Sequence, residues 1–193
     1  MVGIGGISMS GLAEILMNKD VKITGSDLQE TEITKRLRDM GAVINIGHSA
    51  GNISGQDLVV YTAAVSQDNP ELIEARNCNI PTIERSELLG AIMDQFENCI
   101  AVSGTHGKTT TTSMISSILL EAGLDPTIHV GGILGIIGGN TRIGNSSYFI
   151  AEACEYKNSF LHFRPSLAVV LNIDADHLDF FRDIEHIKSS FEA

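Results

Sequence analysis

The chain has 193 residues, 43% of them hydrophobic, and a formal net charge of −11, so it can hold one large globular domain or two small ones. The acidic balance disfavours nucleic acid as a partner, and no apolar run approaches the roughly 20 residues that a membrane span needs. Three scattered cysteines favour reduced thiols and a cytoplasmic location over a disulfide framework.

Apolar and helix-like segments alternate along the first half of the chain. Strands are expected at Val2–Ile4, Val21–Thr24, Val43–Ile46, Leu58–Thr62 and Pro81–Ile83. Helices are expected at Ser8–Asn18, Glu32–Met40, Pro70–Asn77 and Ser86–Gln95, the last with Ser86 as its N-cap.

The second half continues the alternation. Strands are expected at Cys99–Ser103, Thr127–Val130, Tyr148–Glu152 and Leu167–Ile173, and helices at Thr109–Ala122 and from Ile184 onward. This pattern predicts an α/β fold of parallel sheets covered by helices. Because two glycine loops each follow a strand, we expect two such domains, residues 1–96 and 97–193, the second incomplete at its C-terminus.

The glycine loop at 104–107 carries the strongest chemical signal. It follows an apolar strand and opens a helix with Lys108-Thr109, which is the layout of a phosphate-binding loop. Lys108 supplies a mobile cation, and the Thr109 hydroxyl is placed to ligate Mg²⁺. Val102 stands where the strict motif needs glycine, which disfavours the ordinary GTPases and motor ATPases. The structural alternative is a plain glycine turn before a helix.

A second glycine loop spans residues 3–11 and resembles the dinucleotide fingerprint, with Ser8 at the third glycine position. Asp27 ends the second strand, about where a carboxylate that binds ribose belongs. The loop predicts a bound nucleotide diphosphate of unspecified kind, and a tight strand–helix turn is the alternative.

Acidic residues and a histidine follow two later strands. Glu155 comes after one strand and His177 after another, and the carboxyl ends of parallel strands share one edge of a sheet. We expect Glu155 and Thr109 to hold one Mg²⁺ and His177 to hold a second. The alternatives are a solvated surface acid for Glu155 and a capping or core histidine for His177. Arg142 could meet a substrate phosphate or lie in a solvated loop, and His106 could touch phosphate.

Taken together, the motifs resemble the Mur ligase family of peptidoglycan synthesis over essentially the whole chain. The resemblance is carried by Gly3-Ile4-Gly5-Gly6 through Met9-Ser10-Gly11, Gly25-Ser26-Asp27, Asn69-Pro70-Glu71-Leu72, Gly104-Thr105-His106-Gly107-Lys108-Thr109-Thr110-Thr111, Ala151-Glu152-Ala153-Cys154-Glu155 and Asn172-Ile173-Asp174-Ala175-Asp176-His177.

The resemblance implies a Rossmann-like domain that binds UDP-N-acetylmuramate, a central domain that binds ATP and Mg²⁺, and a third domain. In such ligases the substrate carboxylate attacks the γ-phosphoryl of ATP, and the amine of L-alanine displaces phosphate from the acyl phosphate. The UDP-substrate residues implied are Gly5, Gly6, Ser8, Met9, Ser10, Gly11, Ser26, Asp27, His48 and Thr62. The ATP residues implied are Gly104, Thr105, His106, Gly107, Lys108, Thr109 and Thr110. Lys108, Glu155 and His177 are implied as catalytic, and Thr109, Glu155 and His177 as metal ligands.

Three departures keep alternatives open. Cys154 stands where many members carry Asp, and Tyr156-Lys157 where many carry Ser-Asp, and Tyr156 raises the related ligase that recycles a tripeptide onto UDP-N-acetylmuramate. The missing third domain leads us to expect no complete ligation by this chain alone. A non-catalytic nucleotide-binding module that senses NAD and a folate-polyglutamate-type ligase are the further alternatives.

Overall fold

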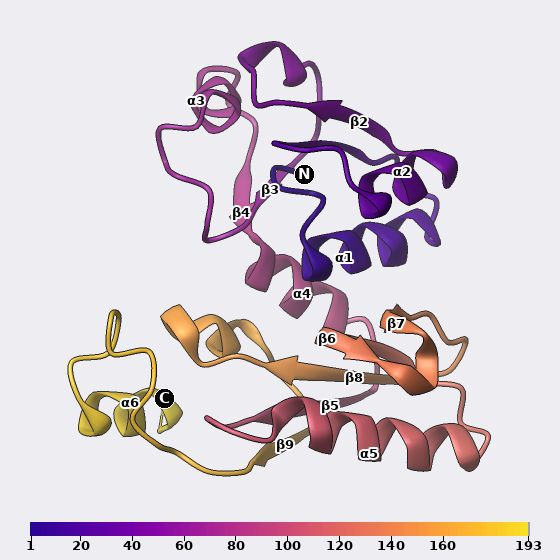
Figure 1. The fold of residues 1–193 in the computed structure, drawn as a ribbon, viewed down its shortest axis with the longest axis vertical. Helices are drawn as coiled ribbons and strands as arrows, with labels where there is room; N and C mark the ends of the chain where they lie inside the picture. Colours follow the sequence, from indigo (N-terminus) through magenta and orange to yellow (C-terminus); the bar gives the residue numbers. More distant parts are fainter. Residues whose placement is uncertain (193) are drawn as a thin grey trace. The chain divides into compact units, whose positions relative to one another are not determined.

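The structure, a computed structural model, describes residues 1–192 and divides into two compact units, Met1–Leu88 and Leu89–Ala193 (Figure 1). Both units are α/β, as the alternation predicts. The division falls inside helix α4, Arg85–Met93, whereas the sequence analysis places the boundary at Glu97, so the domain limits remain a proposal.

The first unit is a parallel sheet with helices between its strands. In chain order its elements are α1 (Ile7–Met17), β1 (Thr24–Asp27), α2 (Glu32–Asp39), β2 (Val43–Ile46), η1 (Ala50–Asn52), β3 (Val59–Tyr61), α3 (Pro70–Asn77) and β4 (Thr82–Glu84). β1 pairs with β2, β3 pairs with β4, and Val2 bridges Ser26 on one side and Tyr61 on the other. The sheet therefore reads β2-β1-Val2-β3-β4, and the loop after Val2 lies where the strand order reverses.

Three sequence predictions in this unit are wrong. The strand expected at Val2–Ile4 reduces to the bridge at Val2, because Gly3 has a φ of +80°. The second strand is Thr24–Asp27, not Val21–Thr24; it uses Gly25 because a Cβ there would lie 2.6 Å from Cδ1 of Ile4. Ser86 is not an N-cap, since α4 already begins at Arg85.

Two apolar clusters hold this sheet between its helices. Ile4 packs with Leu37 of α2 and Ile44 of β2, and Val2 packs with Leu72 of α3. Both clusters include residues next to the glycine loop, so burial of Val2 and Ile4 fixes where the loop starts.

The second unit is a five-stranded sheet in the order β7-β6-β8-β5-β9. Its elements are β5 (Asn98–Ser103), α5 (Lys108–Glu121), β6 (Thr127–Leu134), η2 (Gly135–Ile137), β7 (Gly139–Arg142), β8 (Tyr148–Ala153), η3 (Tyr156–His162), β9 (Leu167–Val170) and α6 (Ile184–Phe191). All pairs are parallel except β6 with β7. The sequence missed β7, because Gly139-Asn140-Thr141-Arg142 has no apolar pattern and forms a strand through its ladder with β6.

Helix α5 covers this sheet, with Ile115 and Leu119 packed on Ile128 and Ile150 (Figure 1). Because β5, β8 and β9 are parallel neighbours, the residues that follow them meet at one edge. Within residues 1–192, no helix has the length and apolar character required to span a membrane.

Candidate nucleotide-binding sites

The conformation of the loop between β5 and α5 requires its two glycines, Gly104 and Gly107. Gly104 has a φ of +129° and Gly107 a φ of +85°, both in the region that disfavours other residues. A Cβ on Gly104 would also lie 2.9 Å from the carbonyl oxygen of Asn172. The chain therefore passes close to the end of β9 before it turns into the helix.

The helices that follow the two glycine loops have uncapped N-termini. α1 and α5 have no side-chain cap and no acidic residue in the first turn. By contrast, α2, α3 and α6 are capped by Thr31, Asn69 and Asp183, and each carries an acidic residue in its first turn. With no side-chain cap and no acidic residue in the first turn, the helix dipole is unopposed and favours an anion at α1 and α5.

Polar side chains tie the second loop to the end of β9. The Asn172 side chain accepts a hydrogen bond from the His106 amide at 2.9 Å and donates one to the His106 carbonyl at 3.0 Å. The Thr105 hydroxyl accepts from the Asp174 amide at 2.8 Å. The sequence analysis quoted Asn172 in a motif but gave it no role; its position just after an apolar strand was the available signal.

Lys108 and Glu155 form a largely buried ion pair beside this loop. Nζ of Lys108 lies 3.1 Å and 3.3 Å from the two carboxylate oxygens of Glu155, and it also donates to the carbonyls of Gly104 and Thr105. The side chains of Lys108 and Glu155 are 18% and 2% exposed. The structure thus brings together two of the residues predicted to be catalytic.

His177 completes the group on the other side of Glu155. Its Nε2 lies 4.0 Å from Oε1 of Glu155, and its ring lies 4.8 Å from the ring of Tyr156. The Tyr156 hydroxyl donates to Asp179 at 2.8 Å, and this hydrogen bond raises the pKa of Tyr156. One buried carboxylate therefore lies between a lysine cation and an imidazole.

The donor set is compatible with a magnesium nucleotide. Thr109 is exposed in the first turn of α5, and Glu155 offers carboxylate oxygens, the ligand type that Mg²⁺ prefers. Asp176 accepts from the His177 amide at 2.7 Å, and Asp174 lies 3.8 Å from His106. Within residues 1–192, no three His, Cys, Asp or Glu side chains form a metal-binding group by themselves.

Arg142 has a structural partner. It pairs with Asp125 at 2.5 Å and donates to the Pro126 carbonyl at 2.8 Å. The guanidinium of Arg142 and the amide of Asn145 hold the pKa of Asp125 below its usual value. Arg142 thus fastens β7 to the segment before β6.

The first glycine loop closes around a carboxylate. The Gly5 amide donates to Oδ2 of Asp27 at 2.8 Å, and a Cβ on Gly5 would lie 2.8 Å from the same oxygen. A Cβ on Gly3 would lie 3.6 Å from Thr62, which follows β3. The loop, Asp27 and Thr62, all predicted for the UDP substrate, therefore share one end of this sheet.

The predicted residues on α1 are mostly turned inward. Met9 and Ser10 are 1% and 0% exposed, and the Ser10 hydroxyl donates to the Ile7 carbonyl at 2.8 Å. Ser8 accepts from Arg85 at 2.8 Å. A ligand at this helix would therefore meet backbone amides and Gly6 rather than the Met9 and Ser10 side chains.

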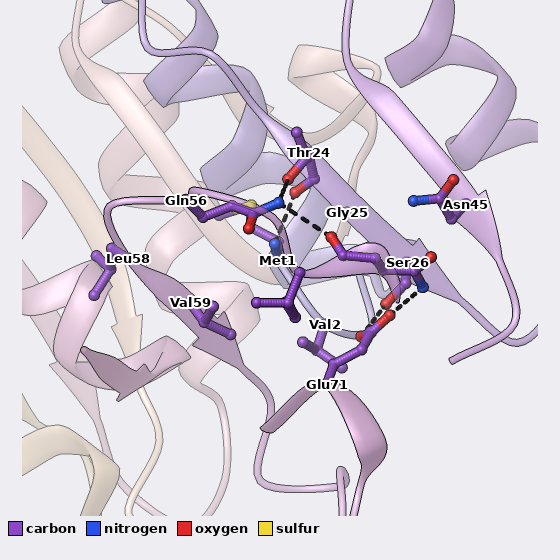
Figure 2. Close-up of a pocket in the computed structure, with 12 residues that line it drawn as sticks. Met1, Val2, Thr24, Gly25, Ser26, Asn45, Gln56, Leu58, Val59 and Glu71 are labelled. Atoms are coloured by element: carbon purple, nitrogen blue, oxygen red, sulfur yellow. Dashed lines mark hydrogen bonds between the residues drawn. The ribbon is translucent and has the colours of Figure 1, made fainter. Parts of the chain in front are cut away.

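Ser26 and His48 meet a residue that the sequence analysis left without a role, Glu71. The buried Ser26 hydroxyl donates to Glu71 at 2.5 Å, and Nδ1 of His48 lies 3.1 Å from Ser26. Figure 2 shows Glu71 from α3 joined to Ser26 at one wall of a small cavity, with Thr24 and Gln56 farther along it. Glu71 stands in the quoted motif Asn69-Pro70-Glu71-Leu72, which was the only sequence signal for it.

Comparison with known proteins assigns both units to one family. Residues 1–97 match the description "Mur ligase family, catalytic domain", and residues 102–193 match "Mur ligase middle domain". The chain belongs to the Mur ligase family. The resemblance inferred from the sequence motifs is thereby confirmed.

The chain is 63% identical over 190 residues to a UDP-N-acetylmuramate–L-alanine ligase of Acetivibrio thermocellus and 60% identical to one of Clostridium novyi. These alignments cover 98% of this chain but only 40% and 42% of the two Mur ligases, so the chain spans about two fifths of such relatives.

Solved Mur ligase structures share the fold. The UDP-N-acetylmuramate–alanine ligase of Thermotoga maritima superposes with a TM-score of 0.90 at 36% identity, covering 99% of this chain and 45% of that one. The UDP-N-acetylmuramate:L-alanyl-γ-D-glutamyl-meso-diaminopimelate ligase of Neisseria meningitides gives 0.88 at 29% identity, covering 98% and 64%.

Proposed function

We propose that this chain supplies the UDP-substrate-binding and ATP-binding units of an ATP-dependent ligase that joins L-alanine to UDP-N-acetylmuramate in the cytoplasm. The observation that carries the proposal is the group Lys108, Glu155 and His177 beside an uncapped glycine loop. The choice of UDP-N-acetylmuramate as substrate and L-alanine as acceptor follows the names of the relatives at 60% identity or more.

The chemistry of the second unit follows from its charges. A carboxylate is a poor electrophile, so the substrate must be activated by transfer of the γ-phosphoryl group before an amine attacks it. The loop amides and Lys108 would bind the phosphates and neutralise the charge that spreads over the transferring group. Thr109 and Glu155 would hold one Mg²⁺ and His177 a second, and Mg²⁺ when bound withdraws charge from the phosphate oxygens.

The first unit would bind the uridine diphosphate. The glycine loop at Gly5 and Gly6 and the N-terminus of α1, which has no side-chain cap, would face the diphosphate, and Asp27, His48 and Thr62 would contact the nucleoside. Ser26 would act indirectly and not as a ligand contact, because its hydroxyl donates to Glu71.

One observation favours a second candidate, the ligase that attaches a tripeptide. The solved tripeptide ligase from Neisseria meningitides has nearly the same TM-score as the solved alanine ligase, 0.88 against 0.90. Its identity of 29%, against 63% for an alanine ligase, makes L-alanine the preferred acceptor.

Calorimetry tests binding by the chain itself. We expect UDP-N-acetylmuramate and ATP–Mg²⁺ to bind and NAD not to bind. NAD binding without any response to the uridine ligand would contradict the proposal and favour a nucleotide-sensing module.

A chimera tests the reaction. The chain replaces the corresponding two fifths of the Acetivibrio thermocellus relative, and phosphate release is followed with UDP-N-acetylmuramate, ATP and either L-alanine or the tripeptide. Release with L-alanine only is expected. Release with the tripeptide only would select the second candidate, and the chimera with Lys108→Ala is the inactive control.

A further inference from the structure

A buried carboxylate in the first unit gathers hydrogen-bond donors from three other segments. Glu71, in the first turn of α3, is 1% exposed. Its Oε2 accepts from the Ser26 hydroxyl at 2.5 Å and lies 3.3 Å from Nδ1 of His48, and its Oε1 accepts from the side chain of Asn52. A buried carboxylate with this many donors organises its surroundings, because removing it would take a hydrogen-bond partner from each of them.

Counting protons in this cluster assigns the tautomer of His48. Ser26 has one hydroxyl proton, and it is donated to Glu71. Nδ1 of His48 therefore faces two acceptors, the Ser26 oxygen at 3.1 Å and the Glu71 carboxylate at 3.3 Å, so it must carry a hydrogen. In a neutral imidazole this leaves Nε2 as a hydrogen-bond acceptor.

The cluster lies under the edge where a nucleoside is expected. Ser26 precedes Asp27 at the carboxyl end of β1, and His48 follows β2 by two residues. The cavity beside Ser26 and Glu71 is about 20 Å³, room for a water molecule and not for a nucleotide (Figure 2). Glu71 therefore cannot touch a ligand and can act only through its partners.

We propose that Glu71 is a positioning residue that holds His48 as the Nδ1–H tautomer, so that Nε2 accepts a hydrogen bond from an N–H or O–H group of the uridine. The inference rests on the proposed binding of UDP-N-acetylmuramate. It adds Glu71 to the site and states which hydrogen-bonding role His48 plays. Such outer partners fix the orientation of the imidazole that they contact.

The tautomer can be measured without any ligand. Long-range proton–nitrogen NMR of the chain labelled with ¹⁵N-histidine, recorded near pH 8, should show His48 protonated at Nδ1; His48→Gln identifies its signal. Glu71→Gln should shift His48 toward the Nε2–H form, and Glu74→Gln, a half-buried change on the same helix, should not. Protonation at Nε2 in the wild-type chain would overturn the inference.

Calorimetry connects the tautomer to recognition. Glu71→Gln should weaken UDP and UDP-N-acetylmuramate about 10-fold and leave ATP–Mg²⁺ unchanged, while Glu74→Gln should change neither. N3-methyl-UDP and 2′-deoxy-UDP show whether the base or the ribose supplies the donor, since the analogue that lacks it loses sensitivity to Glu71→Gln.

The outcomes separate the two proposals. Wild-type affinity in Glu71→Gln overturns this inference and leaves the proposed function standing. Failure of the wild-type chain to bind any uridine ligand overturns the proposed function and the recognition role together, whatever the tautomer. If Glu71→Gln does not fold, Asn52→Ala removes one donor to Glu71 and should weaken UDP about 3-fold; an unchanged affinity there counts against the inference.

Discussion

The two glycine loops of this chain share a backbone design and differ in the charge that other strands bring to them. The first follows the buried bridge residue Val2 and the second follows strand β5, and each enters a helix with an uncapped N-terminus. The first loop closes around the carboxylate of Asp27, whereas the second carries Lys108, which pairs with buried Glu155. An uncapped helix N-terminus suits any phosphate, so the neighbouring side chains decide whether the site binds a nucleoside diphosphate or a phosphoryl group in transfer.

The loops also differ in which groups hold them. Asn172 binds both the amide and the carbonyl of His106 in the second loop. The first loop is held instead by backbone hydrogen bonds from Gly3 and Ile4 to the Ser26 carbonyl, and the side chain of Asp27 accepts from the Gly5 amide. Positioning matters more where a phosphoryl group moves, because a small displacement of reacting atoms lowers the rate steeply.

Lys108→Ala should produce the largest difference between the loops. Loss of the charged donor should weaken ATP–Mg²⁺ by about 100-fold and leave UDP-N-acetylmuramate unchanged. Calorimetry with both ligands measures this, and Lys188→Ala, an exposed lysine of the same unit, is the control. Equal losses for both ligands would mean that the loops do not have separate roles.

Gly104→Ala tests how closely the second loop approaches β9. The added Cβ would meet the Asn172 carbonyl and strain a φ of +129°, so unfolding free energy should fall by about 3 kcal/mol. Gly123→Ala also has a positive φ but open space around it, and should cost about 1 kcal/mol. Urea unfolding compares the two variants. Similar losses of unfolding free energy would mean that the close contact with Asn172 does not contribute.

Asp27→Asn should break the first loop alone. An amide replaces the carboxylate that accepts from Gly5, and we expect about a 10-fold weaker affinity for UDP-N-acetylmuramate with ATP binding intact. Asp39→Asn, at the exposed end of α2, is the matched control. An unchanged affinity for UDP-N-acetylmuramate in Asp27→Asn would mean that this carboxylate does not contribute to the site.

Arg142→Gln should have the smallest effect on ligands, because this cation is fixed to Asp125 and not to a loop. ATP affinity should be unchanged, in contrast to Lys108→Ala. Since Arg142 lowers the pKa of Asp125 in the folded state, the pair stabilises the fold above the ordinary pKa of aspartate, about 3.9, and this is lost as pH falls. The melting temperature of the variant should therefore be below wild type at pH 7 and approach it near pH 3; a constant gap would contradict this.

Much of the fold was predictable from local signals. Helix α3 was predicted with its observed bounds, because Pro70 and the Asn69 cap mark its start. β2 was also predicted at Val43–Ile46. The errors fall where a neighbour outweighs propensity: β1 uses Gly25 because Ile4 leaves no room for a side chain there, and β7 forms through its pairing with β6.

By itself the sequence determined the two loops, their helices and the candidate residues Lys108, Glu155 and His177, because glycine conformation and helix start signals act over a few residues. Only the tertiary structure decided which distant groups meet. Asn172 reaches His106 from another strand, and Glu71 gathers Ser26, His48 and Asn52 across the first unit. These contacts depend on strand order and burial, which no local pattern specifies, and the buried partners they select decide how each exposed residue can act.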